Sequence, residues 1–195
     1  MTTAMCSPVN VISLSEGPLS QELFGELWEE LFLKTGALWG RISSGSMGPL
    51  LRANDRVLVE RINPSVVRFG DVILFKSGSA HVVHRVLARR SMQGSVSFLE
   101  KGDRNPFAGF VPASEVLGRV RAVERNTGTT DLVSGRGRVL QIVLACYGLA
   151  TLVVRQMVRG LLRRFGVSQG RGLGRQFDRL TGAVLDVLVG IAGGS

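Results

Sequence analysis

The fold is decided by residues 71–88, which read DVILFKSGSAHVVHRVLA. Two runs rich in Val, Ile, Leu and Phe lie on either side of Ser77-Gly78-Ser79. Small residues of this kind are typical of a turn, and short apolar runs of this length are typical of strands. The stretch therefore predicts two neighbouring strands of an antiparallel β unit.

Similar runs continue on both sides of this stretch, and turn-forming residues such as Asn63-Pro64 and Asn105-Pro106 separate them. Their sequences are RVLVERI (56–62), SVSFLEKG (95–102) and EVLGRVRAVE (115–124). Strands at such spacing suggest a closed or strongly bent antiparallel unit. No helix longer than one turn is expected between residues 55 and 112.

The N-terminal part contains an acidic amphipathic segment, SQELFGELWEELFLKTG, at residues 20–36. Its apolar residues recur at helical spacing, which predicts a helix at about 20–35 that packs on the β unit. The apolar residues of this predicted face are Leu23, Phe24, Leu27, Leu31 and Phe32. Glutamates fill the opposite face, which we expect to meet solvent.

The whole chain is therefore expected to be an α+β protein with a mainly-β core at about residues 40–125. A leader and the amphipathic helix occupy 1–40, the core 41–125, a polar linker 126–138, and a helical tail 139–195. Within the tail, the Gly/Arg-rich segment 168–175 predicts a hinge before a last amphipathic helix.

The tail carries most of the positive charge. Of the chain's net charge of +9, residues 131–195 contribute +6, from nine arginines and three aspartates. An apolar stretch at 139–154 precedes Arg155, Arg159, Arg163 and Arg164. This stretch allows three interpretations: a buried core helix, an interfacial helix anchored by arginines, or a marginal membrane span. We expect contact with a membrane surface through 139–166, and no nucleic-acid partner, because few aromatic residues accompany the arginines.

Candidate chemistry begins with the sequence SSGSMGPLL at residues 43–51. A serine becomes a nucleophile when a base removes its proton, and the chain has two histidines, His81 and His84. They lie three positions apart in one predicted strand, so they point to opposite faces and one at most serves a given site. The two cysteines, Cys6 and Cys146, have no metal-binding spacing.

The joint pattern of SGSMGPLLRANDRVLVE, VRFGDVILFKSG, HVVHRVL, FLEKGDRNP and VLGRVRAVE resembles the type I signal peptidases and the related repressor-type self-cleaving serine peptidases. The resemblance covers residues 41–125. A histidine followed by arginine at 84–85 resembles the archaeal, endoplasmic-reticulum and sporulation-type branch, whereas the bacterial housekeeping branch has lysine there.

The resemblance implies that Ser46 is the nucleophile and His84 the general base. It further implies that Ser44 supplies an oxyanion contact and that Met47 shapes the site by packing. Asp103 matches the family's Gly-Asp box. Since no acidic residue follows in RNPFAGF, we expect that Asp103 orients His84 or that the enzyme works as a Ser-His dyad.

The expected activity is therefore a serine endopeptidase that removes signal or leader peptides from precursor polypeptides, with neither metal nor cofactor. The expected location is a membrane, the bacterial inner membrane or its equivalent, with the cytoplasm as the alternative. Two other functions stay open. One is a catalytically degenerate binding module, and the other is a self-cleaving regulator. The second fits less well because residues before 41 leave little room for a helix-turn-helix domain.

Overall fold

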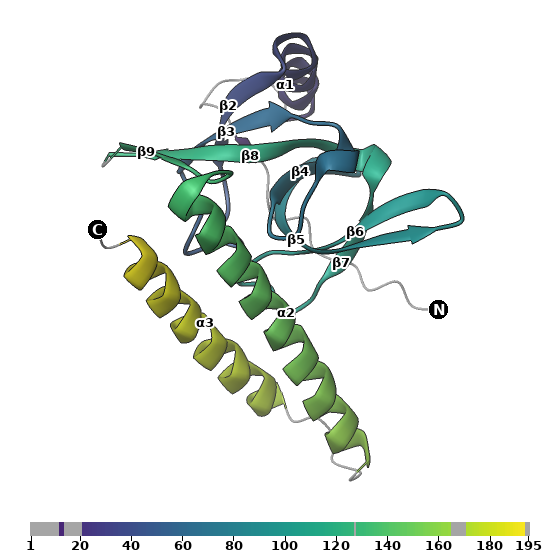
Figure 1. Cartoon of the computed structure of the whole chain (residues 1–195), viewed down its shortest axis with the longest axis vertical. Helices are drawn as coiled ribbons and strands as arrows, with labels where there is room; N and C mark the ends of the chain where they lie inside the picture. Colours follow the sequence, from purple (N-terminus) through teal and green to yellow (C-terminus); the bar gives the residue numbers. More distant parts are fainter. Residues whose placement is uncertain (1–11, 14–20, 127, 165–170, 194–195) are drawn as a thin grey trace.

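The computed structural model describes residues 12–13, 21–126, 128–164 and 171–193. Three α-helices are present in these ranges, α1 (Gln21–Thr35), α2 (Gly135–Arg164) and α3 (Arg171–Gly193), together with short 3₁₀ helices at Pro64–Val66 and Ala113–Glu115. The same ranges contain nine strands: β1 (Ile12–Ser13), β2 (Ala37–Ile42), β3 (Arg56–Arg61), β4 (Val72–Ser77), β5 (Ala80–Met92), β6 (Ser95–Lys101), β7 (Gly109–Pro112), β8 (Val116–Arg125) and β9 (Gly128–Asp131). The predicted α+β class, with a mainly-β core between helices, is confirmed (Figure 1).

The strands form one antiparallel sheet in the order β1-β2-β3-β8-β4-β5-β6-β7, with β9 paired to β8. Hairpins join β4 to β5 and β5 to β6, as alternating apolar runs separated by turns predict. Register shifts interrupt the pairing of β8 with β3 and with β4, and the pairing of β5 with β6. Such bulges bend strands, and the sheet is accordingly curved and left open at β1 and β7.

Sequence reasoning found five of these nine strands and missed β1, β2, β7 and β9. The run ALWGRI at β2 lies mostly outside the predicted core, and β7 has four residues, too few for a pattern to stand out. Strand β9 falls inside the predicted linker 126–138, and α2 begins there too, at Gly135. No helix longer than one turn lies between residues 55 and 112, as expected.

Helix α1 has the predicted boundaries, but its buried face agrees with the expected one only in part: Phe32 is buried as expected, and the side chains of Leu23 and Phe24 lie outside the described residues. Trp28 and Phe32 stack with ring centroids 4.9 Å apart and are buried, whereas Leu27 and Leu31 are each 49% exposed. The ring of Phe32 packs over the sheet at Gly118, where a Cβ atom would lie 2.8 Å from the ring edge. A large aromatic pair buries more surface than the leucines do, so it turns the helix toward the sheet.

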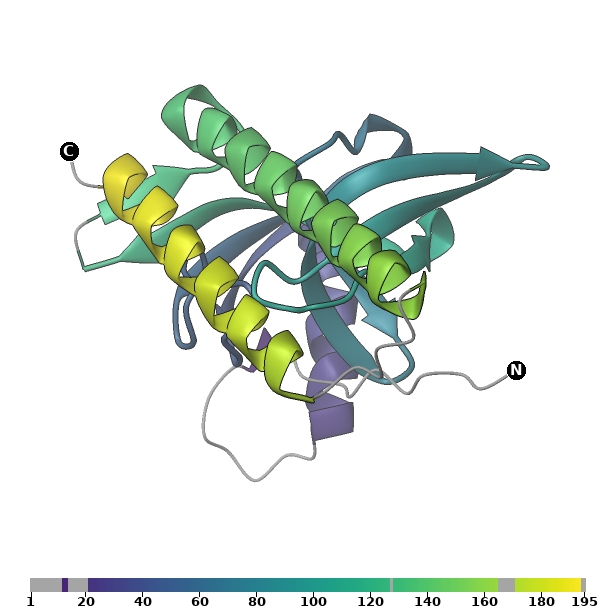
Figure 2. The ribbon, with the colours of Figure 1, turned by 90° about the horizontal axis from the view of Figure 1, so that it is seen from below.

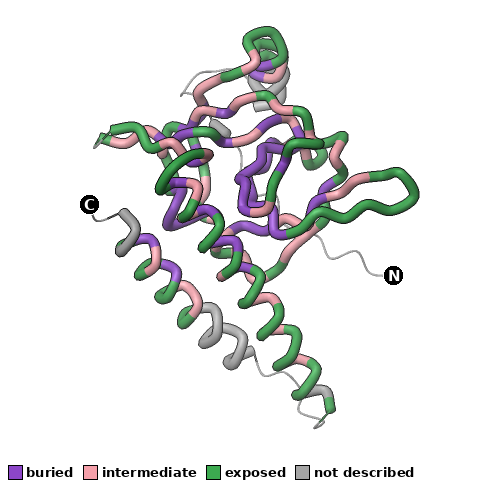
Figure 3. The backbone as a smooth tube through the Cα atoms, in the orientation of Figure 1, coloured by how far each residue is buried: buried purple, intermediate pink, exposed green. Residues whose placement is uncertain are grey.

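The long helix α2 crosses one side of the sheet, and α3 lies beside it (Figure 2). Gln141, Leu144 and Ala145 are buried against the β core. The later turns of α2 extend past the sheet and are mostly exposed (Figure 3). Residues 171–175, expected in a hinge, belong to α3, and the remainder of that predicted hinge, 168–170, lies outside the described residues.

Helix α2 is long and apolar enough to cross a membrane over Gly135–Leu161, and the mean hydropathy of its 18-residue apolar window is 1.8. Within this segment, 28% of the 18-residue apolar window is buried inside the protein. Length and composition alone are weak evidence for a span, because the core helix of a soluble protein has the same properties.

Candidate active site

The segment that carries Ser46 is a compact turn, held by backbone hydrogen bonds and by the packing of Met47 into the core. The Gly48 N–H donates to the Gly45 carbonyl at 3.0 Å, and the Leu51 N–H donates to the Met47 carbonyl at 3.0 Å. Met47 is buried in the main core cluster, as the packing role expected for it requires. Ser44 and Ser46 are half-buried and Ser43 is exposed, so the turn presents Ser46 from a rigid base.

His84 lies on β5 and receives its carboxylate partner from the neighbouring strand. Glu100 on β6 stands opposite Val86, two residues from His84 on the same face. This diagonal position is within reach of a long side chain. Nδ1 of His84 is hydrogen-bonded to Oε2 of Glu100, and both side chains are largely buried.

Gly109 on β7 makes space for this carboxylate. It stands opposite Glu100 in the β6–β7 pairing, and a Cβ atom at position 109 would overlap Oε1 of Glu100. The Glu100 carboxylate therefore lies between the His84 ring and the backbone of β7 at Gly109, which has no side chain. A side chain on β7 would push it away from the imidazole.

The loop 102–106 connects His84 with the Ser46 turn. The backbone N–H of Arg104 donates to the Ser46 carbonyl at 2.8 Å, and Nδ2 of Asn105 lies 3.4 Å from Nε2 of His84. A Cβ atom at Gly102 would lie 3.0 Å from Nε2 of His84, so this glycine allows the loop to run close to the imidazole. Ser46 and His84, 38 residues apart in the sequence, are thus brought to the same loop.

Asp103 does not contact His84, in contrast to the role expected for it. Its carboxylate accepts two hydrogen bonds from Arg85, from Nε and Nη2, both at 2.7 Å. Arg85 is completely buried and also donates to the Gly70 carbonyl at 3.0 Å and to the side chain of Gln141. Asp103 therefore neutralises a buried arginine that ties β5 to α2, and Glu100 takes the position beside the histidine.

This arrangement defines the protonation pattern of the imidazole. A carboxylate accepts hydrogen bonds and cannot donate when ionised, so Nδ1 of His84 carries the proton that Glu100 accepts. The lone pair of Nε2 then faces the loop 102–106, where the Asn105 amide is a donor. Nε2 is therefore the ring nitrogen in position to exchange a proton with a neighbouring group.

His81 belongs to a different environment, under helix α1. Its Nε2 lies 3.6 Å from Oε2 of Glu29, and its ring is tilted against Trp28 at 5.7 Å. Burial lowers the pKa of His81 below its ordinary value, an effect partly opposed by the Glu29 charge and reinforced by Lys76. The two histidines thus lie on separate faces of β5, as their spacing predicts, and His84 is the one at the Ser46 turn.

Within the described ranges no group of three His, Cys, Asp or Glu residues is arranged to hold a metal ion. Sequence reasoning missed Glu100 and Asn105. The sequence does show Glu100 as an acidic residue within the predicted strand SVSFLEKG. Its position diagonal to His84 depends on the register between β5 and β6, and that register is not visible in the sequence. No protein-family profile and no curated protein matches this chain.

Proposed function

We propose that the chain is a serine endopeptidase in which Ser46 is the nucleophile, His84 the general base and Glu100 the residue that orients His84. The observation that carries this proposal is the position of His84. Its Nδ1 is bound to Glu100, and its Nε2 faces the loop whose backbone binds the Ser46 carbonyl. The resemblance of residues 41–125 to type I signal peptidases supports Ser46 and His84 in these roles, whereas Glu100 is assigned from its contact with His84 and replaces the expected Asp103.

In the proposed reaction, Nε2 of His84 removes the Ser46 proton as Oγ attacks the carbonyl carbon of the scissile peptide bond. The backbone N–H of Ser46 and the Ser44 hydroxyl are the proposed donors to the oxyanion. The imidazolium then gives its proton to the leaving amine, which breaks the C–N bond and leaves an acyl-enzyme. A water molecule, deprotonated by His84, hydrolyses the ester and restores Ser46.

The proposed substrate is a precursor polypeptide cleaved at a membrane surface. Exposed apolar residues follow the later turns of α2, among them Val153, Val154, Met157, Val158 and Leu161. An interfacial orientation fits better than a span, because the first half of α2 is tied to the β core by Arg138–Asp71 and Arg85–Gln141 contacts. With its first half packed on the β core, α2 can place its exposed apolar face on the surface of a bilayer.

The test is cleavage of a pre-protein, followed by gel, with the wild-type chain, Ser46→Ala and His84→Gln. Ser43→Ala is the matched control, since Ser43 is exposed in the same turn and has no assigned role. We expect cleavage by the wild type and by Ser43→Ala, and loss of cleavage in the other two variants. Equal cleavage by all four chains contradicts the roles of Ser46 and His84, and absence of cleavage by all four, the wild type included, favours a binding module without catalysis.

The membrane location is tested by flotation with vesicles that contain anionic lipid. Val154→Glu and Met157→Glu place charges on the exposed apolar face of α2, where they cost membrane affinity without touching the β core. We expect both variants to float less than the wild type. Gln156→Glu, an exposed polar position on the same helix, is the control. Flotation of Val154→Glu and Met157→Glu equal to that of a floating wild type contradicts membrane contact through this face, and a wild type that does not float supports the cytoplasmic alternative.

A further inference from the structure

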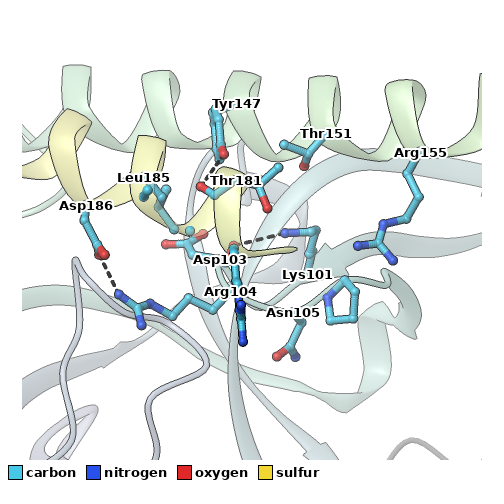
Figure 4. Close-up of a pocket in the computed structure, with 14 residues that line it drawn as sticks. Lys101, Asp103, Arg104, Asn105, Tyr147, Thr151, Arg155, Thr181, Leu185 and Asp186 are labelled. Carbon is cyan, nitrogen blue, oxygen red and sulfur yellow. Dashed lines mark hydrogen bonds and ion pairs between the residues drawn. The ribbon is translucent and has the colours of Figure 1, made fainter. Parts of the chain in front are cut away.

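A pocket of about 390 Å³ lies directly behind the loop 101–106. This loop forms one wall, and helices α2 and α3 form the others (Figure 4). Neither Ser46 nor His84 lines the pocket, so it is distinct from the proposed catalytic centre. It is closed at its helical end by the Tyr147 hydroxyl, which donates to the Thr181 carbonyl.

The charges of the lining are predominantly positive. Four of the described lining residues are cationic, namely Lys101, Arg104, Arg155 and Arg179, and two are acidic, namely Asp103 and Asp186. Both acidic groups are paired: Asp103 with the buried Arg85 at 2.7 Å, and Asp186 with Arg104 at 2.5 Å. The pocket therefore has an excess of positive charge in a concave surface, which raises the local concentration of anions.

Two of the cations are held in place by their surroundings. Lys101 is 5% exposed, and its Nζ donates to the carbonyls of Gly102 and Asp103, both at 3.1 Å. The guanidinium of Arg155 lies 5.6 Å from the centre of the Phe107 ring, which braces it. A cation fixed before binding loses less entropy when it meets an anion.

The pocket shares its wall with the candidate active site. The backbone N–H of Arg104 is bound to the Ser46 carbonyl, and Asn105 reaches Nε2 of His84 from the same loop. Arg104 and Asn105 therefore belong both to the surroundings of Ser46 and His84 and to the lining of the pocket, so a polypeptide held at the Ser46 turn meets the loop that forms the pocket wall.

We propose that this pocket binds the carboxylate of an acidic side chain of the polypeptide substrate, and so sets a preference for Glu or Asp near the cleavage site. The proposal rests on the proposed peptidase function. Ionised carboxylates accept hydrogen bonds only, and arginine and lysine donate only, so the two sets of groups are complementary. The Thr151 hydroxyl lines the same space but donates to the Gly148 carbonyl at 2.8 Å, so the proposed donors to the carboxylate are the charged side chains.

The first test is cleavage of a peptide series in which one glutamate is moved through an otherwise neutral sequence, each compared with its glutamine counterpart. We expect kcat/KM to be about tenfold higher for glutamate at one position, the effect of one charge-assisted hydrogen bond. Arg155→Gln and Arg179→Gln should bring this ratio close to one by lowering kcat/KM for the glutamate peptide.

The control is Arg164→Gln, which removes the same charge from the exposed end of α2 outside the pocket. This variant should keep the wild-type ratio. The proposal is overturned if no position prefers glutamate, if the ratio survives in the Arg155→Gln/Arg179→Gln double variant, or if Arg164→Gln lowers it equally.

A second test does not require catalysis. The Ser46→Ala chain is titrated with fluorescent glutamate and glutamine peptides, and anisotropy reports binding. Tighter binding of the glutamate peptide that is lost with Arg155→Gln and Arg179→Gln supports the pocket even if no peptide is cleaved. Equal binding of both peptides overturns the proposal. If anionic vesicles also displace the bound peptides, a lipid headgroup is identified as the occupant of the pocket.

Discussion

Replacing Glu100 by Gln tests which carboxylate serves His84. The substitution keeps the size of the side chain and removes its charge. The Glu100 side chain is 13% exposed, so an intermediate effective dielectric constant applies. Two unit charges about 4 Å apart at an effective dielectric constant of about 20 interact by about 4 kcal/mol. If this stabilisation of the imidazolium is lost in the transition state, kcat falls by about 10³-fold.

The assay is single-turnover cleavage of a peptide substrate, with thermal unfolding of each variant measured in parallel. Glu100→Gln is expected to lose activity while staying folded. Asp103→Asn is the comparison, because it leaves Arg85 buried without its charged partner. Breaking such a pair costs about 3–5 kcal/mol of stability, so this variant should unfold at lower temperature and, where folded, retain cleavage. A folded Asp103→Asn chain that is inactive beside an active Glu100→Gln chain would refute the assignment.

Three further outcomes are expected. Gly109→Ala should lower kcat, because its methyl group displaces the Glu100 carboxylate, and a Gly160→Ala control in the exposed part of α2, where a Cβ atom meets nothing within 4 Å, should leave kcat unchanged. Burial lowers the pKa of His81 in the folded chain, so the unfolded chain binds a proton at this histidine first as the pH falls. The free energy of unfolding, measured by denaturant titration, should therefore decrease below about pH 6.5, the ordinary histidine value. His81→Phe should flatten this decrease. Phe32→Ala should reduce the free energy of unfolding by about 3–5 kcal/mol, since the ring is fully buried between α1 and the sheet, and a loss below about 1 kcal/mol in urea would contradict that packing.

The strands of the core could be predicted because their signal is local. Val, Ile, Leu and Phe alternate with turn residues over 71–88, and this pattern depends on neighbours in the chain alone. The opposite faces of His81 and His84 follow from the two-residue period of a strand in the same way. The hydrophobic spacing also predicted α1, although the choice between Leu31 and Trp28 for its buried face depends on the sheet beneath it.

The start of α2 could not be predicted, because the segment GRGR at 135–138 has the composition of a linker. It is helical because Arg138 pairs with the buried Asp71 at 2.7 Å and Gln141 binds Arg85. These contacts join residues about 60 positions apart, and tertiary interactions of this kind override a weak local preference.

By itself the sequence determined an α+β chain with a curved antiparallel core, a turn that carries Ser46 and a strand that carries His84. The tertiary structure decided which carboxylate meets that histidine. Asp103 and Glu100 are three residues apart in the chain, and no local pattern separates them. The β5–β6 register, shifted between Val86 and Ala88, places Glu100 diagonally to His84, and the buried Arg85 draws Asp103 to the other side. Because a one-residue slip of a strand exchanges its faces, this choice exists only once the strands have paired.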